Sequence, residues 1–143
     1  MKQTILTISM IAISIVMATY IQAQDYRNAL GNRIGQVESD GTVRDATGRR
    51  LGKIESDGTV RDAIGSRIGK IEKDGTVRNA KGNRLGTIQL DGTVRNASGN
   101  RLGRIESDGT VRNSKGNRLG KVQGGNHQII ATCYFFFFFN KTE

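Results

Sequence analysis

Apolar residues recur along this chain with a period of 17 residues, from about residue 24 to residue 123. Each unit holds two short segments rich in β-branched residues, separated by turn sequences such as Ser-Asp-Gly and Ala-Lys-Gly. This pattern predicts repeated β-hairpins, because Asp-Gly and Lys-Gly turns between such segments are typical hairpin signals. A fixed period also indicates a repeat architecture, in which each unit buries its apolar face only against its neighbours.

The apolar positions of the repeat fall into three slots. The first slot holds Tyr26, Val43, Val60, Val77, Val94 and Val111; the second holds Ile34, Leu51, Ile68, Leu85, Leu102 and Leu119; the third holds Val37, Ile54, Ile71, Ile88, Ile105 and Val122.

The register of the first hairpin type follows from its loop length. A three-residue loop at 56–58 places Ile54 opposite Val60, whereas a two-residue loop would place Ile54 opposite Arg61. Apolar pairing therefore favours the three-residue loop, with Gly58 in the left-handed conformation that glycine adopts without steric cost.

The second hairpin type predicts an irregularity in each repeat. A loop at 80–82 places Val77 opposite Leu85 and Arg78 opposite Arg84. Leu85 and Ile88 are three residues apart, so a regular strand would point them to opposite faces. A bulge or bend at Gly86, and at the equivalent glycine of every repeat, would turn both inward.

These features predict an all-β fold in which antiparallel hairpins are arranged radially in a closed, flower-like or propeller-like ring. The first strand near residues 26–28 and the last near residues 118–120 each lack a partner, and their pairing would complete a sixth hairpin and close the ring. A β-solenoid with one repeat per coil is the alternative.

The chain divides into three parts. Residues 1–23 have the features of a signal peptide, with Lys2 at the start, an apolar core over 5–18 and Ala23 before the expected cleavage site. Residues 24–126 form the repeat domain, and residues 127–143 form an apolar aromatic tail. A retained membrane anchor is the alternative, but the apolar run over 5–18 is shorter than the roughly 20 residues that a spanning helix needs. We therefore expect an exported protein, periplasmic or extracellular, with no transmembrane segment after cleavage.

The C-terminal tail contains five consecutive phenylalanines, Phe135 to Phe139. Exposed to water, such a run would promote aggregation. We expect the apolar run from Ile129 to Phe139 to be buried as a strand, in the centre of the ring or on one face, where it would enlarge a thin core. Membrane insertion or association with another chain is the alternative.

Net charge suggests a class of partner. The formal charge is +9, which favours anionic partners, although a basic surface also serves solubility alone. Two slots hold arginine in every repeat: Arg27, Arg44, Arg61, Arg78, Arg95 and Arg112, and Arg33, Arg50, Arg67, Arg84, Arg101 and Arg118.

The predicted register makes the two arginine slots cross-strand neighbours, which is mildly destabilising and could serve an anionic ligand. Local neutralisation is the alternative, by Glu38, Glu55, Glu72 and Glu106, with Asp45 and Asp62. The repeats lack the stacking aromatic residues of single-stranded nucleic-acid grooves, so we expect no nucleic-acid partner.

No catalytic, metal-binding or cofactor-binding residues are predicted, and we expect no enzymatic activity. His127 and Cys133 are the only residues of their types, whereas a catalytic triad needs three cooperating groups and a zinc site needs several ligands. The turn residues Asp40, Asp57, Asp74, Asp91 and Asp108 offer one carboxylate per loop, which suits turn formation better than calcium binding.

Units such as Gly103-Arg104-Ile105-Glu106-Ser107-Asp108-Gly109-Thr110-Val111-Arg112-Asn113 resemble the β-flower repeat proteins, both four-fold and five-fold, which are small exported bacterial proteins. The resemblance covers about residues 24–123 and implies radially arranged hairpins with no established activity. It leaves five-fold or six-fold closure open. The sequence thus predicts an exported, non-enzymatic structural or binding protein, or alternatively a module that binds acidic glycan or lipopolysaccharide, an envelope component, through its repeated arginines.

Overall fold

The computed structural model describes residues 24–124 and 126–136. They form twelve β-strands and one helix: β1 (Gln24–Asn28), β2 (Arg33–Val37), β3 (Thr42–Asp45), β4 (Arg50–Ile54), β5 (Thr59–Asp62), β6 (Arg67–Ile71), β7 (Thr76–Asn79), β8 (Arg84–Ile88), β9 (Thr93–Asn96), β10 (Arg101–Ile105), β11 (Thr110–Asn113), β12 (Arg118–Val122) and α2 (His127–Tyr134). Residues 1–23, and with them the predicted signal peptide, lie outside the described part.

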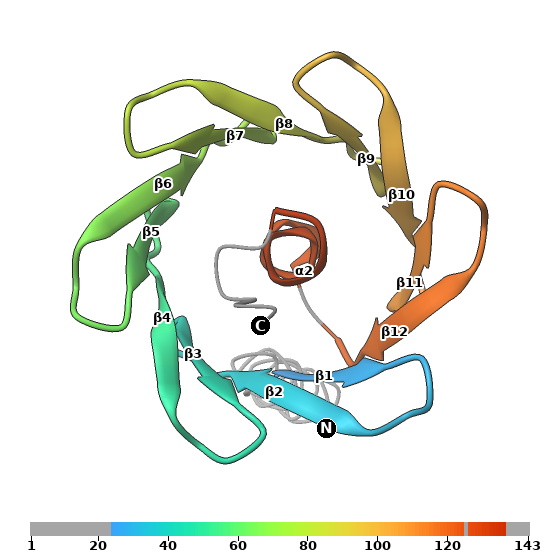
Figure 1. Ribbon diagram of the computed structural model, residues 1–143, viewed down its shortest axis with the longest axis horizontal. Helices are drawn as coiled ribbons and strands as arrows, with labels where there is room; N and C mark the ends of the chain where they lie inside the picture. The colour runs from blue at the N-terminus through green and yellow to red at the C-terminus, as the bar shows by residue number, and fades with distance from the viewer. Residues whose placement is uncertain (1–23, 125, 137–143) are drawn as a thin grey trace, which may run out of the picture.

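The strands form one closed antiparallel ring in chain order, with β1 hydrogen-bonded to β12. Tyr26 faces Val122 and Asn28 faces Gly120 across this closing pair. Figure 1 shows outward-pointing hairpins arranged radially around α2. The predicted flower-like ring is confirmed, closed through the first and last strands as expected, and the β-solenoid alternative is wrong. The twelve strands make six outward hairpins, from β1/β2 to β11/β12.

The turns that join one outward hairpin to the next have the predicted geometry. Ile54 faces Val60 across the β4–β5 turn. Gly58 has φ +89° and donates its N–H to the carbonyl oxygen of Glu55 over 2.9 Å. The side chain of Asp57 accepts a hydrogen bond from the backbone N–H of Thr59 over 2.9 Å. The Asp-Gly pair therefore stabilises each turn through the carboxylate and the left-handed glycine together.

The outward hairpins contain the predicted irregularity, with one correction to their register. Arg78 faces Arg84 as expected, but Val77 faces Gly86 and not Leu85. Leu85 is the extra residue of a bulge, and an equivalent shift occurs in all six outward hairpins. The predicted pairing was wrong because it counted residues without the bulge. The bulge lets the second apolar slot pack partly buried against the core.

The core lies on the inner face of the ring and extends onto the helix. Val43, Val60, Val77, Val94 and Val111 have no exposed surface, and the isoleucines and valines of the third slot are also buried. The helix adds buried Ile130, Ala131 and Cys133 to the same cluster. A single apolar core therefore joins the repeats to the C-terminal segment.

The expectation of a buried strand was wrong for residues 129–134, which belong to α2. Asn126 caps the helix by accepting a hydrogen bond from the N–H of Gln128 over 2.8 Å. The helix lies within the ring in Figure 1. Every strand of the closed ring already pairs on both sides, so a segment inside it has no free edge to join. A helix satisfies its own backbone groups, which explains the difference.

Glycines of the bulge make room for aromatic rings. A Cβ atom added at Gly103 would lie 2.6 Å from the ring of Phe135, and one added at Gly86 would lie 2.8 Å from Phe136. Gly120 is in similar contact with Tyr134. Phe135 is buried and Phe136 partly buried, while residues 137–139 of the predicted aromatic run lie outside the described residues. The aromatic side chains thus pack directly on the backbone of the ring.

Candidate functional site

The outer face of the ring carries the repeated cations. Side chains alternate across a strand, so arginines next to the buried valines point outward. The two arginine slots face each other across every outward hairpin, as in Arg44–Arg50, Arg61–Arg67 and Arg95–Arg101. Further cations face the first slot from the neighbouring hairpin. We call the whole set the cationic belt; it comprises the twelve slot arginines with Lys53, Lys70, Arg104 and Lys121.

The first arginine slot is held in place by hydrogen bonds. In each outward hairpin the Nη1 of this arginine donates to a turn glycine carbonyl, for example from Arg61 to Gly65 over 3.0 Å. In four hairpins its Nε also pairs with a glutamate: Arg44 with Glu38, Arg61 with Glu55 over 2.5 Å, Arg78 with Glu72 over 2.6 Å, and Arg112 with Glu106 over 2.6 Å. These four arginines are neutralised locally, which is the alternative that the sequence left open.

The two aspartates proposed as further neutralising groups serve the turns instead. Asp45 pairs with Arg49 at the hairpin tip over 3.4 Å, outside the belt. Asp62 accepts hydrogen bonds from the backbone N–H groups of Ile64 and Ser66. Neither aspartate forms an ion pair with a belt arginine among the residues that the structure describes.

The second arginine slot is exposed and mostly unpaired. Arg33 contacts Asp25 over 3.4 Å. Within residues 24–124 and 126–136, the other five members form no ion pair with a carboxylate: Arg50, Arg67, Arg84, Arg101 and Arg118. Each faces another arginine across the hairpin, so positive charge accumulates along the belt. Guanidinium groups in such an array can form paired hydrogen bonds with carboxylate, sulfate or phosphate groups.

The turn aspartates accept hydrogen bonds within their own turns. Hydrogen bonds from Thr59 hold the pKa of Asp57 below its usual range. Hydrogen bonds from the equivalent threonine of each turn lower the pKa values of Asp40, Asp74, Asp91 and Asp108 in the same way. No group of three or more His, Cys, Asp or Glu residues could hold a metal ion within the described part of the chain. The aspartates therefore act as turn formers in this structure.

The two single-copy residues, His127 and Cys133, lie on α2. His127 is its first residue and is half-buried. Cys133 is buried in the core, and burial raises the pKa of its thiol to about 12. A thiol with so high a pKa is a poor nucleophile near neutral pH.

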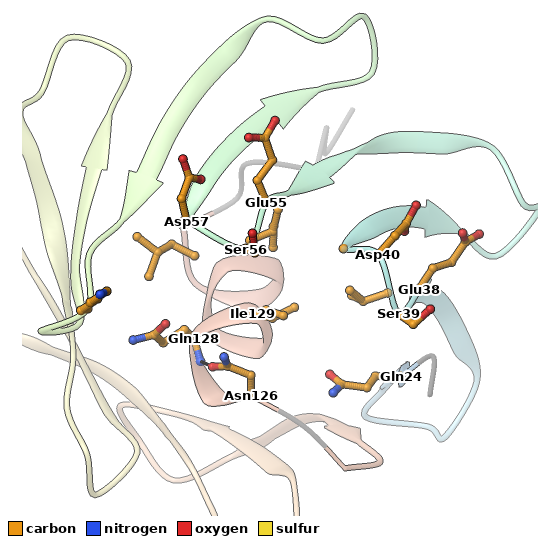
Figure 2. A pocket seen from close by; sticks show the side chains of 16 residues that line it. Gln24, Glu38, Ser39, Asp40, Glu55, Ser56, Asp57, Asn126, Gln128 and Ile129 are labelled. Carbon is orange, nitrogen blue, oxygen red and sulfur yellow. Dashed lines mark hydrogen bonds between the residues drawn. The ribbon is translucent and has the colours of Figure 1, made fainter. Parts of the chain in front are cut away.

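A cavity of about 370 Å³ lies between α2 and three of the inter-hairpin turns. Figure 2 shows Asn126, Gln128 and Ile129 from the helix side, facing the turns that carry Asp40 and Asp57. Glu38 and Glu55 also line it, but their carboxylates pair with arginines of the belt. Asp40 and Asp57 accept backbone hydrogen bonds within their own turns. The acidic groups of this cavity are therefore engaged by the protein itself.

Sequence reasoning missed two features of this site. The first is the helix α2. The second is that Arg95 differs from the other arginines of the first slot. The second feature was readable from the repeats, because Gln89 stands where four other units have glutamate. Within residues 24–124 and 126–136, Arg95 therefore lacks the carboxylate partner that the arginines of those four units have.

Comparison with known proteins identifies the family. The profile described as "5-fold beta-flower protein" matches residues 18–139, which include the whole ring and α2. Searches of curated proteins and of solved structures give no match. Among the described residues no helix has the length and apolarity required to cross a membrane. The ring has six outward hairpins, although the family description names a five-fold arrangement. The chain belongs to the 5-fold beta-flower protein family.

Proposed function

We propose that this protein is an exported, non-enzymatic binding protein that holds an acidic glycan of the cell envelope against its cationic belt. The observation that carries the proposal is the second arginine slot. Its exposed guanidinium groups face other arginines and, in five hairpins, form no ion pair with a carboxylate among the described residues. Opposed cations are unfavourable without an anion between them, so an anionic polymer would relieve the repulsion.

A ring of cations suits a polymer better than a single small ion. Paired strands lie about 4.8 Å apart, so the belt repeats its charges at closely spaced intervals around the ring. Many weak charge-assisted contacts would then add up along one chain of sugar acids. The binding should be sensitive to salt, because exposed charges are screened within about 8–10 Å at ordinary ionic strength.

Export is supported by the features of residues 1–23. A simple test is to express the full chain in a Gram-negative host and sequence the N-terminus of the product. We expect the mature protein to begin at Gln24 and to be recovered outside the cytoplasm. A product that keeps Lys2 and stays in the cytoplasm would contradict export.

The absence of enzymatic activity is proposed on two grounds. The β-flower family is not a known enzyme family. His127 begins α2 without lining the cavity, and Cys133 is buried with a raised pKa. The proposal would fail if a purified sample hydrolysed a glycan or ester substrate and the replacement His127→Ala removed that activity.

Heparin chromatography, followed by binding assays with a uronic-acid polymer and with lipopolysaccharide, tests the binding function. The test variant replaces Arg50, Arg67, Arg84 and Arg118 by glutamine. The control variant removes the same charge outside the belt, by replacing Arg49, Lys73, Lys81 and Lys115 by glutamine. We expect the test variant to elute at clearly lower salt than the wild type, and the control to elute close to it.

Equal losses in the two variants would show that net charge alone causes retention, and the proposal would be wrong. Binding to lipopolysaccharide but to no lipid-free acidic polymer would also overturn it, in favour of a glycolipid ligand. Circular dichroism of both variants checks that the ring is intact, which is expected because all eight side chains are exposed.

A further inference from the structure

One outward hairpin, β9/β10, departs from the charge pattern of the others. In four hairpins the first-slot arginine pairs with a glutamate six residues before it in the chain. In β9/β10 that position is Gln89, which is exposed, and Arg95 forms no ion pair within the described residues. Arg27 also lacks the glutamate, but it contacts Asp25 over 3.9 Å.

Arg95 nevertheless keeps its orientation. Its Nη1 donates to the carbonyl oxygen of Gly99 over 3.1 Å, as the equivalent arginine does in every other outward hairpin. The guanidinium is therefore fixed by the turn and not by the glutamate. A preorganised donor of this kind loses little conformational entropy when an acceptor binds.

One neighbour of Arg95 adds to its unbalanced charge. Arg101 faces it across the hairpin, whereas the residue that faces it from β8 is the neutral Thr87, at a position where three other repeats have lysine. Arg104 is exposed on the same strand as Arg101. Neither Arg101 nor Arg104 forms an ion pair among residues 24–124 and 126–136. Arg95 and Arg101 thus face each other, and neither forms an ion pair with a carboxylate in the part of the chain that the structure describes.

We propose that Arg95 and Arg101 form the primary site for a uronic-acid carboxylate of the ligand, bound where the other hairpins place a glutamate. This inference rests on the proposed function. The other hairpins supply the precedent, since Arg61 and Arg78 bind glutamate carboxylates at 2.5 and 2.6 Å through the same Nε. A free carboxylate of the ligand has the same charge and geometry as that glutamate side chain.

The site is tested by restoring the missing glutamate, which should compete with the ligand. The variant Gln89→Glu is expected to fold, because four repeats already hold glutamate there. Its matched control is Ser56→Glu, which makes the same charge change at an exposed position of the β4–β5 turn. The probe is an oligomer of galacturonic acid, and binding to the purified protein is measured by isothermal titration calorimetry.

We expect Gln89→Glu to raise the dissociation constant about tenfold or more, and Ser56→Glu to change it by less than about twofold. Conversely, Glu38→Gln should free Arg44 and raise the number of oligomers bound per protein. Equal effects of Gln89→Glu and Ser56→Glu would overturn the assignment to Arg95 while leaving the belt intact. Failure of the wild-type protein to bind the oligomer, with normal retention on heparin, would overturn the carboxylate site alone. Failure in both assays would overturn the proposed function as well.

Discussion

At the scale of single residues, the glycines of this chain do two different kinds of work. Gly99 has φ +88°, and a Cβ atom added there would meet no neighbour within 4 Å. Gly103 needs no positive φ, but an added Cβ atom would lie 2.2 Å from the carbonyl oxygen of Arg112 and 2.6 Å from Phe135. The first glycine serves the turn conformation and the second allows the backbone and an aromatic ring to approach.

This distinction predicts two different costs of replacement by alanine. Gly99→Ala should lower the free energy of unfolding by about 1–2 kcal/mol, the cost of the left-handed conformation. Gly103→Ala should cost more, roughly 3 kcal/mol or above, because a rigid carbonyl and a buried ring must both move. Urea denaturation measures the two values, with the neighbouring Ser98→Ala as a control near zero. A Gly103→Ala variant as stable as Gly99→Ala would show that the aromatic rings do not pack on the bulge.

At the scale of elements, the turn carboxylates predict how stability responds to acid. Hydrogen bonds from Thr59 and its equivalents lower the pKa values of Asp40, Asp57, Asp74, Asp91 and Asp108. The unfolded chain, with aspartate pKa values near 3.9, therefore binds more protons than the folded protein below about pH 4. The stabilising contribution is present above that pH and disappears as the pH falls through the lowered pKa values.

We expect the urea midpoint to fall between about pH 5 and pH 2, and to fall less when all five aspartates are replaced by asparagine. Asparagine keeps the acceptor oxygen that binds the threonine N–H but does not titrate in this range. Five Asp→Ser replacements remove the same five charges and leave a weaker acceptor, so this variant controls for the change in net charge. Identical acid sensitivity in the asparagine variant and the wild type would contradict this role of the turns.

The helix predicts the reactivity of the only thiol. Cys133 is buried in the core, and burial raises its pKa to about 12. Near pH 8 an unfolded cysteine is partly thiolate, whereas the folded thiol should be both neutral and inaccessible. Alkylation followed by mass spectrometry should therefore show little reaction in native buffer and rapid reaction in denaturing urea. Rapid alkylation of the native protein would place α2 outside the ring.

At the scale of the whole molecule, the pairing of β1 with β12 is the contact that closes the ring. Arg27 and Lys121 face each other across it. Cross-strand neighbours have Cα atoms about 4.5–5.5 Å apart, within the range of a disulfide. In a Cys133→Ser background, the double replacement Arg27→Cys and Lys121→Cys should give an intramolecular disulfide on oxidation, with no dimer.

The cross-link encloses most of the chain, so it should raise the free energy of unfolding by up to about 4 kcal/mol relative to the reduced form. Arg27→Cys paired with Arg78→Cys is the control, because β1 and β7 are not neighbours in the ring. Equal cross-linking in both pairs, or only intermolecular cross-linking in the first, would contradict closure.

The ring could be predicted from the sequence because its determinants are local and repeated many times. The loop length at Asp57-Gly58 follows from which residues must face each other, and the same answer recurs in every unit. The bulge was foreseen at Gly86, but its effect on the pairing of Val77 was not, because a one-residue shift cannot be counted before the extra residue is known.

The helix could not be predicted in the same way. The sequence from Ile129 to Phe135 is apolar and short, and such a run suits a strand or a buried helix equally. The deciding fact is that the ring leaves no free strand edge, which is a property of the closed structure and not of that segment. The cationic belt was foreseen as two facing arginine slots, whereas the exception at Arg95 depends on which carboxylate reaches which guanidinium.

Mapping of an acidic oligosaccharide on the folded protein by NMR tests the binding account most directly. Backbone amide shifts of the isotope-labelled protein would be recorded while galacturonic acid oligomer is added, with the neutral galactose oligomer as control. We expect the largest shifts on the outward hairpins, centred on the amides near Arg95 and Arg101, and we expect salt to reverse them. Shifts confined to the residues that line the cavity beside α2, or equal shifts with the neutral oligomer, would contradict it.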